Sequence, residues 1–234
     1  MKTLCIIPAR GGSKRIPRKN IRPFLGSPII AYSIRAAQES GLFDEVMVST
    51  DDAEITQTAQ LYGASVPFAR SADTANDYAT TAAVLTEVLN TYAQHGQHFD
   101  RACCLYATAP FVTADKLLEA FGKLETGGFD TVFPVVRFGF PIQRAVVFQQ
   151  NRLTWREPDH ALSRSQDLPA AFHDAGQFYY FNVPNFLETG QLLTTNTSGI
   201  EISELEAQDI DNLTDWQLAE LKVRLLQQNK ESSH

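Results

Sequence analysis

The residues best suited to chemistry stand in one stretch directly after the first apolar run, from Pro8 to Asn20 (PARGGSKRIPRKN). Adjacent Gly11 and Gly12 let the backbone turn sharply and bring N–H groups close to a ligand, and Ser13 adds a hydroxyl donor. Five cations follow one another within ten residues of a chain whose net charge is −7: Arg10, Lys14, Arg15, Arg18 and Lys19. A glycine loop with this charge, placed at a strand end, suits a polyphosphate.

The stretch matches neither of two common phosphate motifs. A Walker A loop needs a second glycine followed by lysine after four intervening residues, and the dinucleotide pattern needs Gly-x-Gly-x-x-Gly. Neither occurs here. A surface turn with solvated basic side chains is the alternative, but the position after a buried strand, where open α/β sheets bind their ligands, favours the polyphosphate.

A second candidate is the pair Asp209 and Asp211 near the C-terminus. In an extended segment, side chains two residues apart share a face, so both carboxylates can reach one cation. Mg²⁺ prefers oxygen ligands and usually bridges to substrate phosphates. The competing interpretation is a helix cap, with Asp211 capping the helix that begins at Asn212.

Apolar runs and helical patterns alternate along the chain before Asp209. The elements that they form must position both the basic stretch and the aspartate pair. The predicted buried strands are Leu4–Ala9, Val46–Ser49, Ala102–Ala107 and Thr131–Val136, with a further strand end expected at Val66–Phe68. The predicted helices are Pro28–Ser40, one capped by Asp51 or Asp52 that runs toward Tyr62, Tyr78–Gln94, and Thr113–Thr126. This alternation predicts an α/β fold: a Rossmann-like, mostly parallel sheet with helices on both faces.

The rhythm changes from about Phe138 to His173. Ala145–Gln149 and Leu153–Arg156 flank a short turn and predict a hairpin, so we expect this stretch to be an antiparallel insertion. An aromatic strand over Gln177–Val183 and a helix from Asp211 to about Gln228 complete the chain. With no linker-like segment, residues 1–234 are predicted to form one domain.

Composition excludes several classes. Charged residues make up 20% of the chain and hydrophobic residues 44%, which is ordinary for a globular protein and excludes disorder or a coiled coil. The acidic balance predicts neither nucleic-acid nor membrane binding. Apolar runs are too short for a membrane span or signal peptide, and Cys5, Cys103 and Cys104 lie in strand-like runs, so we expect reduced, buried thiols and a cytoplasmic protein.

The stretch after the first strand closely resembles the signature of CMP-sialic acid synthetases, which condense CTP with a nine-carbon keto-sugar acid. The resemblance continues through Ser40–Val46, Val48–Asp51, Tyr62–Ala64, Arg70 with Asp77, Ala107–Pro110 and Asp209–Asp211, and covers nearly the whole chain. It implies a nucleotide-diphospho-sugar transferase-like fold and a Mg²⁺-dependent cytidylyltransferase.

Some positions depart from the sialic acid branch. Arg15-Ile16-Pro17 replaces Gly-Leu-Pro, Tyr106–Pro110 replaces Gln-Pro-Thr-Ser-Pro, and Asp174-Ala175-Gly176 replaces Asn-Gly-Ala. These variants resemble the branch of the family that acts on pseudaminic acid. The alternatives are the same chemistry on N-acetylneuraminate or another nonulosonate, a non-catalytic nucleotide-binding module, and a nucleotide-sugar glycosyltransferase, which the late position of the aspartate pair disfavours.

The resemblance also implies roles for individual residues. Lys19, Arg10 and Lys14 would be catalytic, and Asp209 and Asp211 would hold Mg²⁺. Nucleotide binding would use these positions: Ala9, Arg10, Gly11, Gly12, Ser13, Lys14, Lys19, Asn20, Arg70, Asp77 and Thr80. The sugar acid would contact Tyr106, Arg164, Gln177 and Tyr179.

Three of these roles have plain alternatives, and one further expectation concerns assembly. Arg70 is as compatible with a surface ion pair to Asp73 or Asp77, Tyr179 with core packing, and Arg164 with an exposed loop arginine that binds nothing. The family also implies a homodimer, with the insertion at about 138–173 forming the contact and a wall of the sugar pocket.

Overall fold

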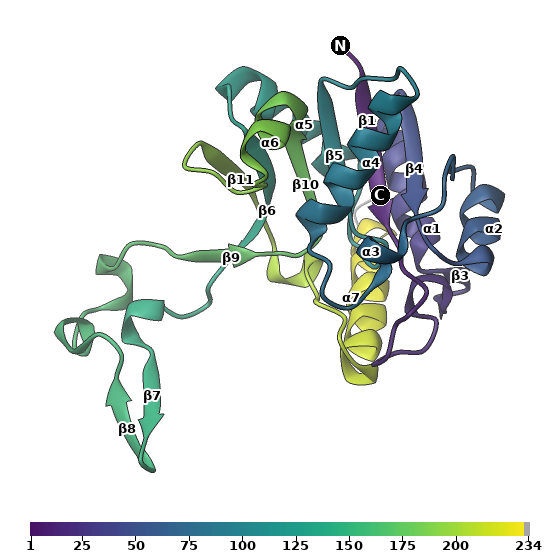
Figure 1. Cartoon of the computed structure of the whole chain (residues 1–234). Coiled ribbons are helices and arrows are strands. Elements are labelled where there is room, and N and C mark those ends of the chain that lie inside the picture. Colours follow the sequence, from purple (N-terminus) through teal and green to yellow (C-terminus); the bar gives the residue numbers. More distant parts are fainter. Residues whose placement is uncertain (232–234) are drawn as a thin grey trace.

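A seven-stranded sheet runs through the centre of the structure, a computed structural model that describes residues 1–231 (Figure 1). The strands lie in the order β11-β6-β10-β5-β1-β4, and β9 pairs with β6. Their bounds are β1 Thr3–Pro8, β4 Glu45–Ser49, β5 Arg101–Leu105, β6 Thr131–Arg137, β9 Phe172–Asp174, β10 Phe178–Asn182 and β11 Thr197–Ile202. β1 is parallel to β4 and β5, and β6 to β11, whereas β10 runs antiparallel between β5 and β6. The predicted mostly parallel sheet is confirmed.

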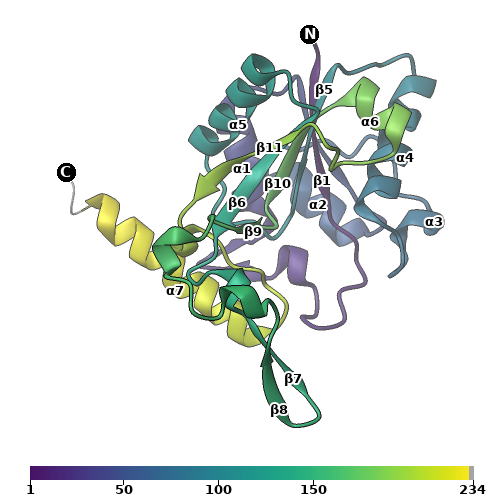
Figure 2. The same cartoon turned by 90° about the vertical axis from the view of Figure 1, so that its left-hand side faces the viewer.

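Helices cover both faces of this sheet (Figure 2). On one face lie α1 (Ile30–Ser40), α2 (Ala53–Leu61) and α5 (Ala114–Gly127); on the other lie α4 (Thr81–Gln94) and α6 (Val183–Thr189). Successive strand residues point to opposite faces, so Cys5 and Ile7 pack under the first set while Leu4 and Ile6 pack under the second. The three cysteines are free and buried, as predicted.

A third apolar cluster fixes the far end of the basic stretch. Helix α7 (Leu213–Glu231) packs Trp216 against Phe24 of the short hairpin β2 (Pro23–Phe24) and β3 (Ser27–Pro28). Ile16, from the middle of the basic stretch, is fully buried in this cluster together with Ile210. The cluster therefore holds the basic stretch and the aspartate segment side by side.

Residues 138–171, most of the predicted insertion, project from the sheet as an arm, and Phe172 and His173 return to the sheet in β9 (Figure 1). The arm contains the predicted hairpin, formed by β7 (Val146–Gln149) and β8 (Arg152–Trp155). Gln150 and Asn151 both have positive φ, as a two-residue hairpin turn of this twist requires. Every residue of β7 and β8 is exposed, the apolar ones included.

Some elements differ from the prediction. Val66–Phe68 is not a strand, because only Ser65 bridges to Met47 of β4 before the chain leaves the sheet. Strand β11, helix α6 and the short helix α3 (Ala72–Ala75) were not predicted. Among the described residues, no helix combines the length and apolar character needed to cross a membrane.

Candidate functional site

A cavity of about 460 Å³ lies at the carboxyl ends of β1 and β5. The chain leaves β1 toward β4 on one side, while β5 lies on the other side of β1. Such a reversal of strand order opens a crevice between diverging loops, where α/β proteins bind ligands. The loop after β1, the segment around α3, the loop after β5 and Asp211 line the cavity.

Four of the five loop cations line this cavity: Arg10, Lys14, Arg15 and Lys19. Arg10 and Lys14 both contact the carboxylate of Asp77, which reaches across from the segment after α3. The hydrogen bonds from Lys14 and Arg10 lower the pKa of Asp77 to about 2. The carboxylate is therefore ionised at neutral pH and neutralises part of the loop's charge.

Lys19 connects the basic stretch to the aspartate pair. Its Nζ donates to the carbonyl of Ile210, 2.8 Å away. Burial lowers the pKa of Lys19, and the nearby charges of Asp211 and Asp209 oppose that shift. Arg15 forms an ion pair with Asp211 at 2.7 Å. Cations and the predicted metal ligands thus share one end of the cavity.

Asp211 does not cap α7, so that alternative is wrong. The oxygen Oδ1 of Asn212 accepts from the amides of Thr214 and Asp215 at 2.8 and 3.1 Å. Asp215 in turn accepts from the amide of Asp211. The helix begins at Leu213 rather than Asp211, and the Asp211 carboxylate faces the cavity.

Asp51 and Asp52, which follow β4, hold the glycine turn at Gly11 in place. The amide of Gly11 donates to Oδ1 of Asp51 at 2.9 Å, and a Cβ on Gly11 would lie 2.7 Å from Oδ2 of Asp52. This close approach requires glycine at position 11, whereas a Cβ on Gly12 would meet open space. Asn20 is buried and donates from Nδ2 to the carbonyl of Arg10 at 3.0 Å.

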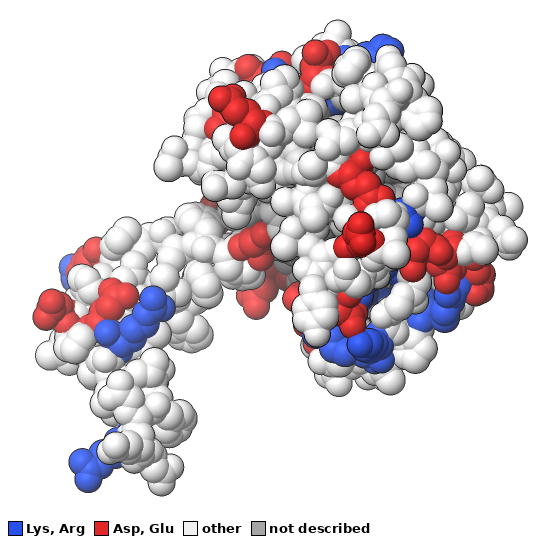
Figure 3. All heavy atoms as spheres, in the orientation of Figure 1, with Lys and Arg blue, Asp and Glu red and all other residues white. Residues whose placement is uncertain are grey.

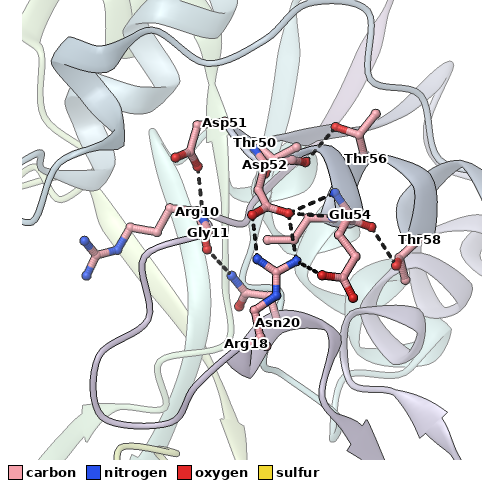
Figure 4. A network of polar contacts seen from close by, with 11 residues as sticks. Arg10, Gly11, Arg18, Asn20, Thr50, Asp51, Asp52, Glu54, Thr56 and Thr58 are labelled. Atoms are coloured by element: carbon pink, nitrogen blue, oxygen red, sulfur yellow. Dashed lines mark hydrogen bonds and ion pairs between the residues drawn. The ribbon is translucent and has the colours of Figure 1, made fainter.

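The fifth cation, Arg18, points away from the cavity toward α2 (Figure 4). Its guanidinium binds the Asp52 carboxylate through two nitrogens, at 2.5 and 2.9 Å, and also contacts Glu54. Spacing alone groups Arg18 with the other four loop cations. In the structure those four line the cavity, and Arg18 does not.

Arg70 is buried at the edge of the cavity, so the surface ion pair considered for it is wrong. Its guanidinium donates to Oγ and to the carbonyl oxygen of Ser49, at 3.1 and 2.6 Å. Burial lowers the pKa of Arg70, and Asp51 and Glu87 oppose the shift. Thr80 caps α4 by accepting from the Ala83 amide at 3.1 Å.

Of the predicted sugar contacts, Tyr106 lines the cavity and donates to or accepts from Thr81 at 3.3 Å. Tyr179 packs against Tyr106 and Phe133, and its hydroxyl donates to Asp174. Burial and that bond raise the pKa of Tyr179. Gln177 is buried and donates to the Glu206 carbonyl.

Eight of the predicted site residues do not line the cavity: Ala9, Gly11, Gly12, Thr80, Arg164, Gln177, Tyr179 and Asp209. Arg164 is in the projecting arm, its side chain 72% exposed and paired with Asp167 at 2.7 Å. Asp209 is exposed beside Lys19, and Ala9 is buried in the core. Arg164 does not meet Tyr106 or the loop cations in this cavity within one chain.

Several cavity residues were not predicted from the sequence: Thr74, Asn76, Ala79, Thr81, Val84 and Thr108. Asn76 stands next to Asp77, and Thr108 lies inside the Ala107–Pro110 motif, so proximity to predicted positions was a usable signal for both.

Blue and red side chains lie next to one another on the surface below α3 and toward α2 (Figure 3).

Comparisons with known proteins agree with this geometry. A family model described as cytidylyltransferase matches residues 4–230. The chain belongs to the cytidylyltransferase family. A pseudaminic acid cytidylyltransferase of Campylobacter jejuni is 43% identical over 96% of this chain and 97% of its own. A CMP-N,N'-diacetyllegionaminic acid synthase of Legionella pneumophila is 31% identical over 97% and 99%.

Among solved structures, a CMP:2-keto-3-deoxy-manno-octonic acid synthetase complexed with CTP matches with a TM-score of 0.69 at 19% identity, over 97% of this chain and 100% of that one. At this identity the match shows a shared fold. The family resemblance read from the motifs is confirmed, and this cytidylyltransferase is an enzyme of the nucleotidyltransferase class.

Proposed function

We propose that the protein condenses CTP with pseudaminic acid to give CMP-pseudaminic acid and diphosphate. The observation that carries this proposal is the 43% identity, over nearly both whole chains, to a pseudaminic acid cytidylyltransferase. Supporting it are a cavity lined by four cations and the departures from the sialic acid pattern at Arg15–Pro17, Tyr106–Pro110 and Asp174–Gly176. Residues 1–234 would act as one nucleotidyltransferase domain.

In this reaction the anomeric hydroxyl of the sugar acid attacks the α-phosphorus of CTP in line, and diphosphate leaves. Catalysis of such a displacement consists mainly of positioning and of stabilising the charge that develops on phosphoryl oxygens. Arg10 and Lys14 would exchange their contact with Asp77 for the triphosphate. The Gly11–Ser13 backbone would approach the phosphates beside them.

Lys19 is the cation we expect to matter most for the rate. Its half-buried ammonium group is already oriented by the Ile210 carbonyl, so little reorganisation is needed when charge develops. Asn20 lines the cavity and also holds the loop by donating to the Arg10 carbonyl, whereas Ala9 is buried in the core. Arg70 and the start of α4 at Thr80 would face the nucleoside.

The residues present fit a magnesium ion. Asp209 and Asp211 offer hard carboxylate oxygens on either side of Ile210, and both act electrostatically on Lys19. Mg²⁺ usually takes one or two carboxylates plus phosphate oxygens and waters, so these two aspartates would supply enough protein ligands. When bound there, Mg²⁺ would neutralise phosphate charge.

The sugar acid would lie near Tyr106, with Gln177 and Tyr179 supporting that wall from β10. A carboxylate is recognised well by the planar fork of arginine, the role proposed for Arg164. We propose that the protein is a homodimer and that the insertion at about 138–173, which includes the arm, forms its contact. Phe140 and Phe148 are 86% and 75% exposed, and a chain of this size rarely leaves such side chains unpaired along one arm.

A panel of free nonulosonic acids tests the substrate assignment. Diphosphate release is measured with CTP, Mg²⁺ and either pseudaminic acid, N-acetylneuraminate or a diacetyllegionaminic acid. We expect turnover with pseudaminic acid at least about tenfold above the others in kcat/KM. A preference for another acid would mean that this acid, and not pseudaminic acid, is the substrate. If none of the acids gave diphosphate release, the protein would be a nucleotide-binding module.

Sedimentation of a charged arm variant tests the dimer. Phe148→Glu should shift the protein toward monomer, because a charge would be buried in the apolar contact. Leu61→Glu is the matched control, since Leu61 is 81% exposed on α2, outside the arm. An unchanged dimer in Phe148→Glu, or a monomeric wild-type protein, would overturn this part.

A further inference from the structure

Arg18 adopts a backbone conformation that residues with side chains avoid. Its φ and ψ are 56° and 31°, in the left-handed region, and it directly precedes the short 3-10 helix Lys19–Ile21. A residue other than glycine keeps this conformation only when its surroundings hold it there. Because Lys19 is the next residue, the turn at Arg18 sets the direction in which the chain delivers Lys19 to the cavity.

The surroundings that hold Arg18 are the acidic residues at the start of α2 (Figure 4). Asp52 accepts two guanidinium bonds, at 2.5 and 2.9 Å, and Glu54 adds a third contact. Two parallel bonds to one carboxylate fix the guanidinium in orientation as well as position. The hydrogen bond from Arg18 lowers the pKa of Asp52 to about 2.

Asp52 is itself rigidly placed. Its Oδ1 accepts from the amides of Glu54 and Ile55, both at 3.0 Å, and thereby caps α2. The same segment holds the other end of the loop, where the Gly11 amide donates to Asp51. On the opposite side, Ile16 is buried against α7. The turn at Arg18 is therefore held between α2 and α7, and neither helix lines the cavity.

We propose that Arg18, through its pair with Asp52, is a positioning residue that sets the left-handed turn and thereby places Lys19 in the cavity. The role of Lys19 rests on the proposed function, whereas the turn does not. Arg18 itself contacts no substrate in this proposal.

Asp52→Asn is the decisive variant. Asparagine caps helices as well as aspartate does, so α2 keeps its cap while the charge-assisted pair with Arg18 is lost. Asp115→Asn on α5 is the matched control, an exposed aspartate in the first turn of a helix away from the cavity. Arg18→Ala removes the pair and leaves the strained turn, and Arg18→Gly removes the strain as well.

The proposal predicts a specific pattern in kcat and KM. Asp52→Asn and Arg18→Ala should each lower kcat about tenfold to a hundredfold through misplacement of Lys19, with the KM for CTP changed less than about threefold. The double variant should lose no more than the worse single variant, since both break one pair. Arg18→Gly should retain more activity than Arg18→Ala.

A direct contact between Arg18 and substrate predicts the opposite. Freeing Arg18 by Asp52→Asn would then leave kcat within about twofold of wild type, and the two losses would multiply in the double variant. Either result overturns the proposal. A purely structural role would lower the melting temperature of Asp52→Asn without changing kcat at temperatures where the protein is folded, which also overturns it.

Limited proteolysis separates failure of this proposal from failure of the proposed function. Trypsin has sites at Lys14, Arg15 and Lys19 in both Asp52→Asn and the wild-type protein. Loss of the Arg18–Asp52 pair should raise the cleavage rate at these sites about fivefold or more, while Asp115→Asn is cleaved at the wild-type rate. If the wild-type protein turned over no sugar acid, the proposed function would fail. Independently of that result, an unchanged cleavage rate in Asp52→Asn would overturn the positioning role of Arg18.

Discussion

Replacing Lys19 by methionine should abolish most of the turnover. Methionine keeps the apolar stem and removes only the ammonium group, which donates to the Ile210 carbonyl at 2.8 Å and faces the cavity. Burial around this group lowers the pKa of Lys19, so its charge acts in surroundings with little water to screen it. Loss of one such donor costs about 2.7–4 kcal/mol, or roughly 10²–10³ in kcat.

The assay is diphosphate release at saturating CTP and pseudaminic acid, with the melting temperature recorded for each variant. Lys116→Met is the matched control. Lys116 has a side chain that is 11% exposed, its Nζ donates to the Phe111 carbonyl at 3.1 Å and forms an ion pair with Glu206 at 2.9 Å, and it lies outside the cavity. We expect the control to keep kcat within about threefold of wild type. A folded Lys19→Met enzyme that also stayed within about threefold would refute the role of Lys19.

Three further outcomes are expected. Asp77→Asn should tighten CTP binding by calorimetry, because it removes a negative charge from Arg10 and Lys14 while keeping a hydrogen-bond acceptor; weaker binding would contradict this. Arg164→Ala should raise the KM for the sugar acid about tenfold or more and leave that for CTP within about threefold; equal effects would exclude a carboxylate contact. Asp52, with its pKa lowered from 3.8 to about 2, contributes stability that is present above pH 4 and lost toward pH 2, so Asp52→Asn should flatten that part of an acid-unfolding curve by about 1 kcal/mol or less; identical curves would contradict the pair.

The sheet and the place of the cavity were predictable because their signals are local. Buried runs such as Leu4–Ala9 mark strands wherever they pair, and a glycine-rich basic stretch after the first of them marks a loop at the sheet's carboxyl edge. Strand β11 was missed because Thr197–Ile202 carries threonine, serine, glycine and glutamate. Its pairing with β6 depends on contacts distant in sequence.

The direction of individual side chains was less predictable. Arg18 has the same charge and spacing as its neighbours, and only its left-handed turn and the acidic start of α2 direct it away from the cavity. Asp211 and Asn212 are equally good caps by residue type, and geometry assigns the cap to Asn212. Arg164 lies in an arm whose surroundings within one chain do not include the cavity.

A crystal structure with CTP and Mg²⁺ bound tests the central claim most directly. The account predicts the triphosphate against Arg10, Lys14 and Lys19, with Asp77 released from the two cations and the metal ion on the Asp209–Asp211 side. A triphosphate bound elsewhere, with Arg10 and Lys14 still paired with Asp77, would contradict it.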